Sequence, residues 1–300
     1  MSAPSPLISV VLPAYNCASY LSQAIESILA QTLADFQLLI VYDESKDDTL
    51  KIIENYLARD PRIVLIYGQG ERLVGALNLG IQASTGTYIA RMDADDISRP
   101  ERFGKQVAQI EKQNLDFCGC NIGMVNEIGR QIKEVIMPTS ADLVTITLAC
   151  TVPFAHGSVM MRKAFLDQHA LRYQAKAFAE DYQFWCQAYH LGARFGNVNE
   201  RLFDYRHFEQ SLSKVHAKVV ARHTSALRRT FVQDNLAAVT AAINRLLASP
   251  VTLSERDSGF LLLAAYLVLL KSRSGIFLKA LVRSNVKNIA IAIAKIARGF

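Results

Sequence analysis

The stretch YIARMDADDISRPER, Tyr88 to Arg102, places three aspartates within four positions at the end of an apolar run. The apolar residues before them predict a buried strand. Ser98 and Glu101 have the spacing of a capping box, with Pro100 in the first turn, which predicts that a helix begins there. The aspartates therefore occupy a short turn between two regular elements. Such a cluster is either a solvated acidic turn or a site for a metal ion.

Strand and helix patterns alternate through the first 115 residues. Short apolar runs at 7–13, 36–43, 62–68 and 88–93 alternate with stretches of helical spacing at 18–32, 47–60 and 71–85. This alternation predicts an α/β fold, with a mostly parallel sheet covered by helices on both faces. Ligands of such sheets bind beyond the carboxyl ends of the strands. Asp93, Asp95 and Asp96 fall at such an end, which favours a binding role.

After residue 115 the pattern becomes a mixture of strands and helices, and beyond about residue 214 it becomes helical. Residues 116–137 predict two strands around a glycine-containing turn, residues 180–192 a helix with Gly192 as its C-cap, and residues 201–206 a last strand. Beyond about residue 214 we expect helices only. The apolar run at 260–270 is shorter than the ~20 residues that cross a bilayer, so we expect it to pack on its neighbours. The expected division is a domain over 1–213 and a helical C-terminal region over 214–300.

The basic charge of the chain lies at its C-terminal end. Residues 258–300 contain seven Lys or Arg and no Asp or Glu, whereas residues 1–257 carry 26 basic and 27 acidic side chains. In residues 276–298 the basic side chains share one side of a helix and most of the aliphatic side chains share the other. This pattern predicts an element that lies on an anionic membrane surface. The alternative is a helix docked on the domain with a solvated basic face.

Composition excludes several classes of protein. Hydrophobic residues make up 51% and charged residues 20% of the chain, which is typical of a globular protein. The body has no basic excess and no helix-turn-helix or RNA-binding pattern, so we expect no nucleic-acid partner. The five cysteines are scattered without a CxxC pair, which favours reduced thiols in a cytosolic protein. The N-terminus lacks the basic and long apolar regions of a signal peptide.

Polar or aromatic side chains follow each of the first three predicted strands. Tyr15 could stack on a nucleobase or pack within its loop. Asp43 is placed to accept a hydrogen bond from a base or a ribose. Arg72 could bind a phosphate through bidentate bonds or lie solvated on the surface. Asp47 and Thr49 have the pattern of a helix cap, and we assign them a structural role.

Carboxylates at two places suit catalysis. Mg²⁺ is typically held by one or two carboxylates together with substrate phosphates, and Asp93 and Asp95 can supply them. The D-x-D pair alone is a weak signal, but its position after a buried strand strengthens it. Glu180 and Asp181 begin a predicted helix, where acidic side chains favour the helix dipole. A carboxylate in a pocket can also act as a general base, and the residues alone leave both interpretations open.

The order of these motifs is similar to that of the family-2 glycosyltransferases, which have the GT-A fold. The family pattern runs P-x-Y-N, D-D-G-S-x-D-x-T, R-x-x-x-x-x-N-x-G, D-A-D-D-x-x-x-P-E-R and then an E-D pair. This chain shows Pro13 to Asn16, then Asp43, Ser45, Asp47 and Thr49, then Arg72, Asn78 and Gly80, then Asp93 to Arg102, and finally Glu180 and Asp181. The segments HGSVMMRK from His156 and YRHFEQSLS from Tyr205 also resemble family segments. The resemblance covers residues 6–213.

The resemblance implies which residues contact the nucleotide-sugar donor. They are Pro13, Tyr15, Asp43, Arg72, Asn78, Asp93 and Asp95. Tyr15 and Asp43 would hold the base, and Arg72 would face the base or the diphosphate. Asp93 would contact the ribose or the sugar. Asp95, together with Asp93, would bind Mn²⁺ or Mg²⁺.

The resemblance also implies an inverting reaction. An acceptor hydroxyl would attack the anomeric carbon from the face opposite the departing nucleoside diphosphate, with Asp181 as the general base. Glu180 and His156 would lie near the acceptor. No covalent sugar intermediate is needed, so no nucleophilic Cys or Ser is expected. The donor implied by the family is a UDP-sugar, with TDP- and GDP-sugars left open.

Two positions of the second motif depart from the family pattern. Tyr42 replaces the first Asp of the second motif, and Glu44 replaces its Gly. The family's His in the Y-R-x-H segment would fall on Phe208, with His207 one position early, so we assign His207 no role.

The basic tail favours an acceptor at a membrane surface. We expect a lipid-linked saccharide of surface polysaccharide or O-antigen synthesis, and a protein at the inner face of the cytoplasmic membrane. We do not expect a processive synthase, because no Q-x-x-R-W motif follows Asp181. One alternative is a sugar nucleotidyltransferase, but the first loop, PAYNCAS, lacks the glycines of a phosphate loop. The other is an inactive nucleotide-sugar binding or scaffold protein, which the retained Asp93, Asp95 and Asp181 disfavour.

Overall fold

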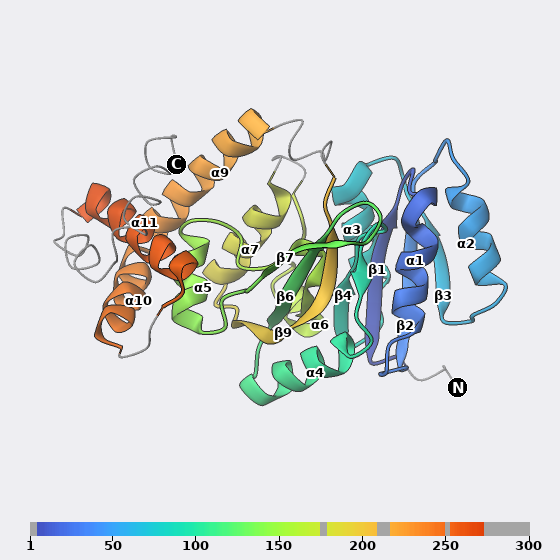
Figure 1. Cartoon of the computed structure of the whole chain (residues 1–300), viewed down its shortest axis with the longest axis horizontal. Coiled ribbons are helices and arrows are strands. Elements are labelled where there is room, and N and C mark those ends of the chain that lie inside the picture. The colour runs from blue at the N-terminus through green and yellow to red at the C-terminus, as the bar shows by residue number, and fades with distance from the viewer. Residues whose placement is uncertain (1–4, 175–178, 209–216, 250–252, 273–300) are drawn as a thin grey trace. The chain divides into compact units, whose positions relative to one another are not determined.

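The strands of the computed structural model belong to one sheet. The structure describes residues 5–174, 179–208, 217–249 and 253–272. Within these residues nine strands follow the order β3-β2-β1-β4-β8-β6-β9-β5, with β7 paired to β6 (Figure 1). The basic amphipathic helix expected over 276–298 lies outside the described residues.

The parallel part of the sheet comes from the N-terminal third of the chain. Its strands are β1 (Ile8–Ala14), β2 (Phe36–Tyr42), β3 (Ile63–Tyr67) and β4 (Tyr88–Arg91). They are joined by α1 (Ala18–Leu29), α2 (Thr49–Leu57) and α3 (Arg72–Ala83). Parallel strands need crossover connections, and these helices provide them. The alternation predicted from the sequence is confirmed.

Different helices cover the two faces of this parallel part. Successive side chains of a strand point to opposite faces. Leu12 of β1 is buried in one cluster with Leu21 and Ile25 of α1. Val11 faces α3, because a Cβ on Gly80 would lie 2.3 Å from the Val11 Cγ1 atom. Burial on both faces explains the continuous apolar runs of these strands.

The second part of the sheet is mixed. β6 (Phe117–Val125) pairs parallel with β9 (Phe195–Arg206) and antiparallel with β7 (Gln131–Val135) and β8 (Met160–Arg162). β8 also pairs with β4, and the short β5 (Ile97–Ser98) pairs with β9. The hairpin predicted over 116–137 and the last strand predicted over 201–206 are confirmed. Gly129 has φ 82° in the hairpin turn, a conformation that favours glycine.

The helix after the aspartates begins later than expected. α4 (Arg102–Gln113) has Glu101 at its N-cap, without a side-chain capping bond. The predicted capping box is wrong, because Ser98 lies in β5 and its Oγ accepts a hydrogen bond from Gln31 Nε2 at 3.1 Å. The Phe103 N–H donates to Gln31 Oε1 at 3.0 Å. The Gln31 side chain, from the segment after α1, therefore accepts a hydrogen bond from a backbone N–H group in the first turn of α4.

The chain divides into two compact units. The sheet unit comprises the described residues of 1–137, 154–176 and 193–211, and the helical unit comprises those of 138–153, 177–192 and 212–300. Besides the strands, the sheet unit contains a short 3₁₀ helix (His156–Ser158) and α6 (Lys163–Gln168). The helical unit contains α5 (Ala141–Leu148), α7 (Glu180–His190), α9 (Ala217–Asp234), α10 (Leu236–Ala248) and α11 (Glu255–Ser272). The expected division at residue 213 stays a prediction.

The long apolar run of the C-terminal region lies in α11. Its residues 260–265 are buried, and α11 packs on α5, α9 and α10. The prediction that this run packs on its neighbours is confirmed. Throughout the described residues, each helix is too short or too polar to cross a membrane.

We expect Gly80→Ala to lower the free energy of unfolding by about 1–3 kcal/mol, because the added Cβ would overpack α3 against β1. Gly104→Ala in α4 is the matched control, because a Cβ there meets nothing within 4 Å. That change should be neutral or stabilise the protein by up to about 1 kcal/mol. Urea unfolding of both variants measures the difference. Equal effects would show that the close approach of α3 to β1 does not require glycine.

Candidate active site

Three carboxylates meet in the turn after β4. β4 ends at Arg91, and the Asp96 N–H donates to the Asp93 carbonyl at 3.4 Å. Asp93, Asp95 and Asp96 each place one oxygen within 4.8 Å of the others. The prediction that these residues follow the carboxyl end of a buried strand is confirmed. Carboxylate oxygens are the ligands that Mg²⁺ and Mn²⁺ prefer.

Burial makes the charge of this turn unfavourable. Burial, followed by the charge of Asp93, raises the pKa of Asp95 to about 6. Burial, with Asp93 and Asp95, also raises the pKa of Asp96 well above its usual range. Asp96 is only 1% exposed, whereas Asp93 and Asp95 are half-buried and can reach a ligand. A divalent cation held by these two carboxylates would offset their repulsion.

A buried arginine lies beside the turn. Arg91 forms an ion pair with Asp93, and its Nε atom has no hydrogen-bond partner within the described residues. Gly157 of the 3₁₀ helix leaves room for these groups. A Cβ on Gly157 would lie 3.0 Å from both Arg91 Nη1 and Asp96 Oδ2, and 2.8 Å from the Phe203 ring. The glycine of the HGSVMMRK segment is therefore needed for the charged groups to pack.

The loops after β1 and β2 are bonded to each other. The Asn16 N–H donates to Ser45 Oγ at 3.0 Å, and the Lys46 N–H donates to Asn16 Oδ1 at 2.8 Å. Asp47 accepts from the N–H groups of Ala18 (3.0 Å) and Thr49 (3.1 Å). Thr49 Oγ1 accepts from the Cys17 N–H at 2.9 Å. Asp47 and Thr49 thus have a structural role in joining the two loops. The predicted helix cap is wrong, because the N-cap of α2 is Asp48, which makes no side-chain capping bond.

The residues expected to hold the base lie at the ends of these bonded strands. Pro13 is the second-last residue of β1, opposite Val41 of β2. Tyr15 is 61% exposed, so its ring is accessible to a planar ligand. The Asp43 Oδ1 atom accepts from the Gly70 N–H at 3.2 Å. The fold brings the loop of Tyr15 beside the loop of Asp43, and their roles toward a nucleotide stay predictions.

The two expected donor-binding residues of α3 differ in their surroundings. Arg72 is exposed at the start of α3, with φ 59°. Asn78 uses both ends of its amide on the backbone of Tyr173: its Nδ2 donates to the carbonyl, and its Oδ1 accepts from the N–H, each at 2.9 Å. These contacts give Asn78 a structural role. Its expected role toward the nucleotide stays a prediction.

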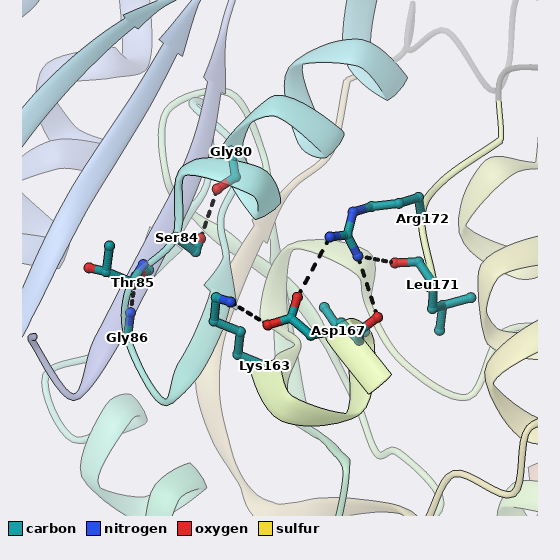
Figure 2. A network of polar contacts seen from close by, with 10 residues as sticks. Gly80, Ser84, Thr85, Gly86, Lys163, Asp167, Leu171 and Arg172 are labelled. Atoms are coloured by element: carbon teal, nitrogen blue, oxygen red, sulfur yellow. Dashed lines mark hydrogen bonds and ion pairs between the residues drawn. The ribbon is translucent and has the colours of Figure 1, made fainter. Parts of the chain in front are cut away.

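Tyr173 links Asn78 to His156. The Tyr173 hydroxyl lies 2.9 Å from His156 Nε2. Burial, followed by the charge of Arg91, lowers the pKa of His156 well below its usual range, so the ring is neutral at pH 7. The segment before Tyr173 is held by Asp167, which forms ion pairs with Lys163 and Arg172 (Figure 2). His156 and its partner are therefore set in a fixed part of the sheet unit.

The two acidic residues of the E-D pair begin α7 of the helical unit. Both lie in the first turn, as predicted. The Asp181 Oδ1 atom accepts from the Tyr182 N–H at 2.6 Å, and Glu180 and Asp181 are half-buried. The general-base role of Asp181 and the acceptor role of Glu180 stay predictions.

Sequence reasoning missed several residues that hold the site together. Arg206 lies in the segment YRHFEQSLS, whose sequence predicts no role for it, although its N–H donates to Asp96 Oδ1 at 2.7 Å. The sequence analysis also predicts no role for Tyr173 or Gly157. The resemblance of HGSVMMRK to a family segment could have pointed to Gly157. No sequence pattern points to Tyr173, because its partner Asn78 is 95 residues away in the chain.

Known proteins resemble this chain in sequence. The profile of Glycosyl transferase family 2 matches residues 9–169. EpsE of Bacillus subtilis is 33% identical over 208 residues, which cover 67% of this chain and 73% of EpsE. The O-antigen biosynthesis glycosyltransferase WbnJ of Escherichia coli is 31% identical over 212 residues, which cover 69% of this chain and 82% of WbnJ.

Solved structures resemble its fold. TarS 1–349 of S. aureus, in complex with UDP-GlcNAc, has a TM-score of 0.60 and 19% identity, over 96% of this chain and 78% of TarS 1–349. The mannosyltransferase PcManGT of Pyrobaculum calidifontis, in complex with GDP-Man and Mn²⁺, has a TM-score of 0.56 and 12% identity, over 98% of this chain and 80% of PcManGT. At these identities the likeness concerns the fold, and the GT-A fold expected from the sequence is confirmed.

We expect Asn78→Ala to lower the free energy of unfolding by about 1–3 kcal/mol, because it removes both bonds to the Tyr173 backbone. Asn55→Ala is the matched control. Asn55 is an exposed residue within α2, so its replacement should change stability by less than about 0.5 kcal/mol. Urea unfolding compares the two variants. If both unfold like the wild type, the bonds to Tyr173 contribute nothing.

Proposed function

Because the chain belongs to glycosyl transferase family 2, we propose that it moves a sugar, with inversion, from a UDP-sugar to a hydroxyl group of a saccharide. Membership of the family makes it a glycosyltransferase acting on nucleotide sugars. The observation that carries the finer proposal is the carboxylate turn after β4, with Asp93 and Asp95 open to a ligand.

The residues of this turn fit a divalent cation. The donor atoms are carboxylate oxygens, they lie close together, and burial raises the pKa of both Asp95 and Asp96, so a cation beside them would favour their charged forms. We assign Mn²⁺ or Mg²⁺ to Asp95 and Asp93. PcManGT, which has the same fold, was solved with Mn²⁺. When bound, the cation would supply positive charge to the leaving diphosphate.

The side chains of the sheet unit would bind and orient the donor. Tyr15 stacks on the base, and Asp43 accepts from the base N–H, an arrangement that suits uracil or thymine. Pro13 shapes their loop, and Arg72 donates to the base or the diphosphate. The complex of TarS with UDP-GlcNAc supports a UDP-sugar, whereas that of PcManGT with GDP-Man keeps a GDP-sugar open.

The acceptor hydroxyl loses its proton to Asp181 as it attacks the anomeric carbon. One displacement inverts that carbon and needs no covalent intermediate. Glu180 and His156 orient the acceptor. Because His156 is neutral and shares a hydrogen bond with Tyr173, it can contact a sugar hydroxyl without changing the charge of the site.

The proposed acceptor is a lipid-linked saccharide at the inner face of the cytoplasmic membrane. Two observations support it. WbnJ, a relative, is named an O-antigen biosynthesis glycosyltransferase. Residues 276–298 have the basic amphipathic pattern of a membrane-surface helix.

We expect release of UDP from a UDP-sugar, given Mn²⁺ or Mg²⁺ and a membrane lipid extract. The rate should fall at least about 100-fold in Asp95→Asn and in Asp181→Asn, because each removes a group that acts in the transition state. Asp60→Asn is the control, since Asp60 pairs with Arg62 before β3 and should leave the rate unchanged. TDP- and GDP-sugars assayed in parallel test which nucleobase the donor site accepts.

Calorimetric titration with UDP separates the two assignments. Asp181→Asn should bind UDP in the presence of Mn²⁺ as tightly as the wild type does, and Asp95→Asn should lose the Mn²⁺-dependent part of the affinity. Full turnover by Asp181→Asn would contradict its role as the base. Turnover without any divalent cation would contradict the metal assignment.

We expect the full chain to sediment with vesicles that contain phosphatidylglycerol at low salt, and not with vesicles of phosphatidylcholine alone. Replacing Lys279, Arg283 and Lys287 by Gln should weaken binding about 100-fold, since each basic residue near an anionic surface contributes about 1 kcal/mol. High salt should also release the protein. Absence of the protein from the vesicle pellet at low salt would contradict the membrane proposal.

A further inference from the structure

Arg206 makes more polar contacts with the aspartate turn than its place in the sequence suggests. It is the last residue of β9 and is 3% exposed. Its N–H donates to Asp96 Oδ1 at 2.7 Å, and its Nε donates to the Asp95 carbonyl at 2.8 Å. One residue therefore holds the backbone of Asp95 and the side chain of Asp96.

The rest of the guanidinium reaches two other segments. Its Nη1 donates to the carbonyls of Asn126 (3.2 Å) and Glu127 (2.5 Å), at the tip of the β6–β7 hairpin. Its Nη2 donates to Gln23 Oε1 of α1 at 2.5 Å, and its Cζ lies 4.6 Å from the centre of the Tyr20 ring. Arg206 thus joins the aspartate turn, the hairpin tip and α1 through one rigid planar group.

The hairpin tip is itself internally bonded. The Gly129 N–H donates to the Asn126 carbonyl, and the Asn126 N–H donates to the Arg130 carbonyl, both at 2.9 Å. The Arg130 N–H donates to Asn126 Oδ1 at 2.8 Å. The carbonyls that face Arg206 are therefore fixed in position, so the tip can act as a support for the turn rather than as a loose loop.

Within the described residues, the Arg206 guanidinium binds neutral acceptors and lies in no ion pair with a carboxylate. Its positive charge is thus left to act on the nearby carboxylates of the turn.

We propose that Arg206 is a positioning residue for the metal site: it fixes Asp95 and Asp96 against the β6–β7 hairpin and α1, so that the Asp93 and Asp95 carboxylates are presented together. This inference rests on the proposed function, since it assumes that the turn binds a divalent cation. Lysine cannot replace Arg206, because a single ammonium group lacks the fork that reaches the Asp95, Asn126 and Gln23 oxygens at once.

The test is Mn²⁺ binding to the full chain, measured by the electron paramagnetic resonance signal of free Mn²⁺, with and without UDP. Residues that orient metal ligands typically contribute 10–100-fold to metal affinity. We expect Arg206→Lys to weaken Mn²⁺ binding by about that factor. In the transfer assay, the Mn²⁺ concentration for half-maximal rate should rise by the same factor, and kcat should recover at saturating Mn²⁺.

Arg201→Lys is the matched control. Arg201 also lies on β9 and contacts the hairpin, donating to Gln131 Oε1 at 2.5 Å and to Asp204 Oδ1 at 2.7 Å. It has no contact with the aspartate turn in the described structure. The Arg201→Lys variant should be less stable than the wild type but should bind Mn²⁺ with the same affinity.

The outcomes separate the inference from the proposed function. If the wild type binds no Mn²⁺ even with UDP, the metal-dependent function fails, and the inference fails with it. If the wild type binds Mn²⁺ and the folded Arg206→Lys binds it equally well, Arg206 is only structural and the inference alone is overturned. If Arg206→Lys does not fold, Gln23→Ala decides, because it removes one acceptor of the guanidinium. It should weaken Mn²⁺ binding at least threefold, and an unchanged affinity would overturn the inference.

Discussion

Repulsion between three carboxylates whose oxygens lie within 4.8 Å of one another is the constraint on which the sheet unit depends. Burial strengthens that repulsion, because little water is present to screen it. The fold offsets part of it from the protein side: Arg91 pairs with Asp93, and the Arg206 N–H binds Asp96. Asp93 and Asp95 remain accessible to a ligand. In the proposed function a divalent cation offsets the repulsion there and attracts the diphosphate of the donor.

The parallel strands explain why the loops that carry Tyr15 and Asp43 lie at the same edge of the sheet. β1 and β2 end in register at Ala14 and Tyr42, so the loops that follow them start side by side. Hydrogen bonds of Asn16 with Ser45 and Lys46 then hold one loop against the other. Motif residues of this family therefore serve two purposes in this chain. Some, such as Tyr15, are left open to a ligand, and others hold the loops that carry them.

Features that depend on local periodicity could be predicted from the sequence. The alternating strands and helices, the hairpin around Gly129 and the helix beginning at Glu180 are in this group, because apolar spacing and turn residues encode them. Features that depend on distant pairing could not. The capping box failed because Ser98 pairs in β5, and the bonds between Asn78 and Tyr173 join residues 95 positions apart. The aspartate turn could be located from its strand, whereas the contacts of Arg206 with it could not, because Arg206 and Asp96 are 110 positions apart. The role of Asp181 rests on the family pattern and stays a prediction.

The central claim is that the turn after β4 holds a divalent cation that bridges to a nucleoside diphosphate. The most direct measurement is X-ray diffraction at the manganese absorption edge, from crystals grown with Mn²⁺ and UDP. We predict one anomalous peak in contact with the Asp95 carboxylate, beside Asp93, and with the diphosphate oxygens. Crystals that hold UDP in the site with no anomalous peak at this turn would contradict the claim, and the three aspartates would then need another explanation.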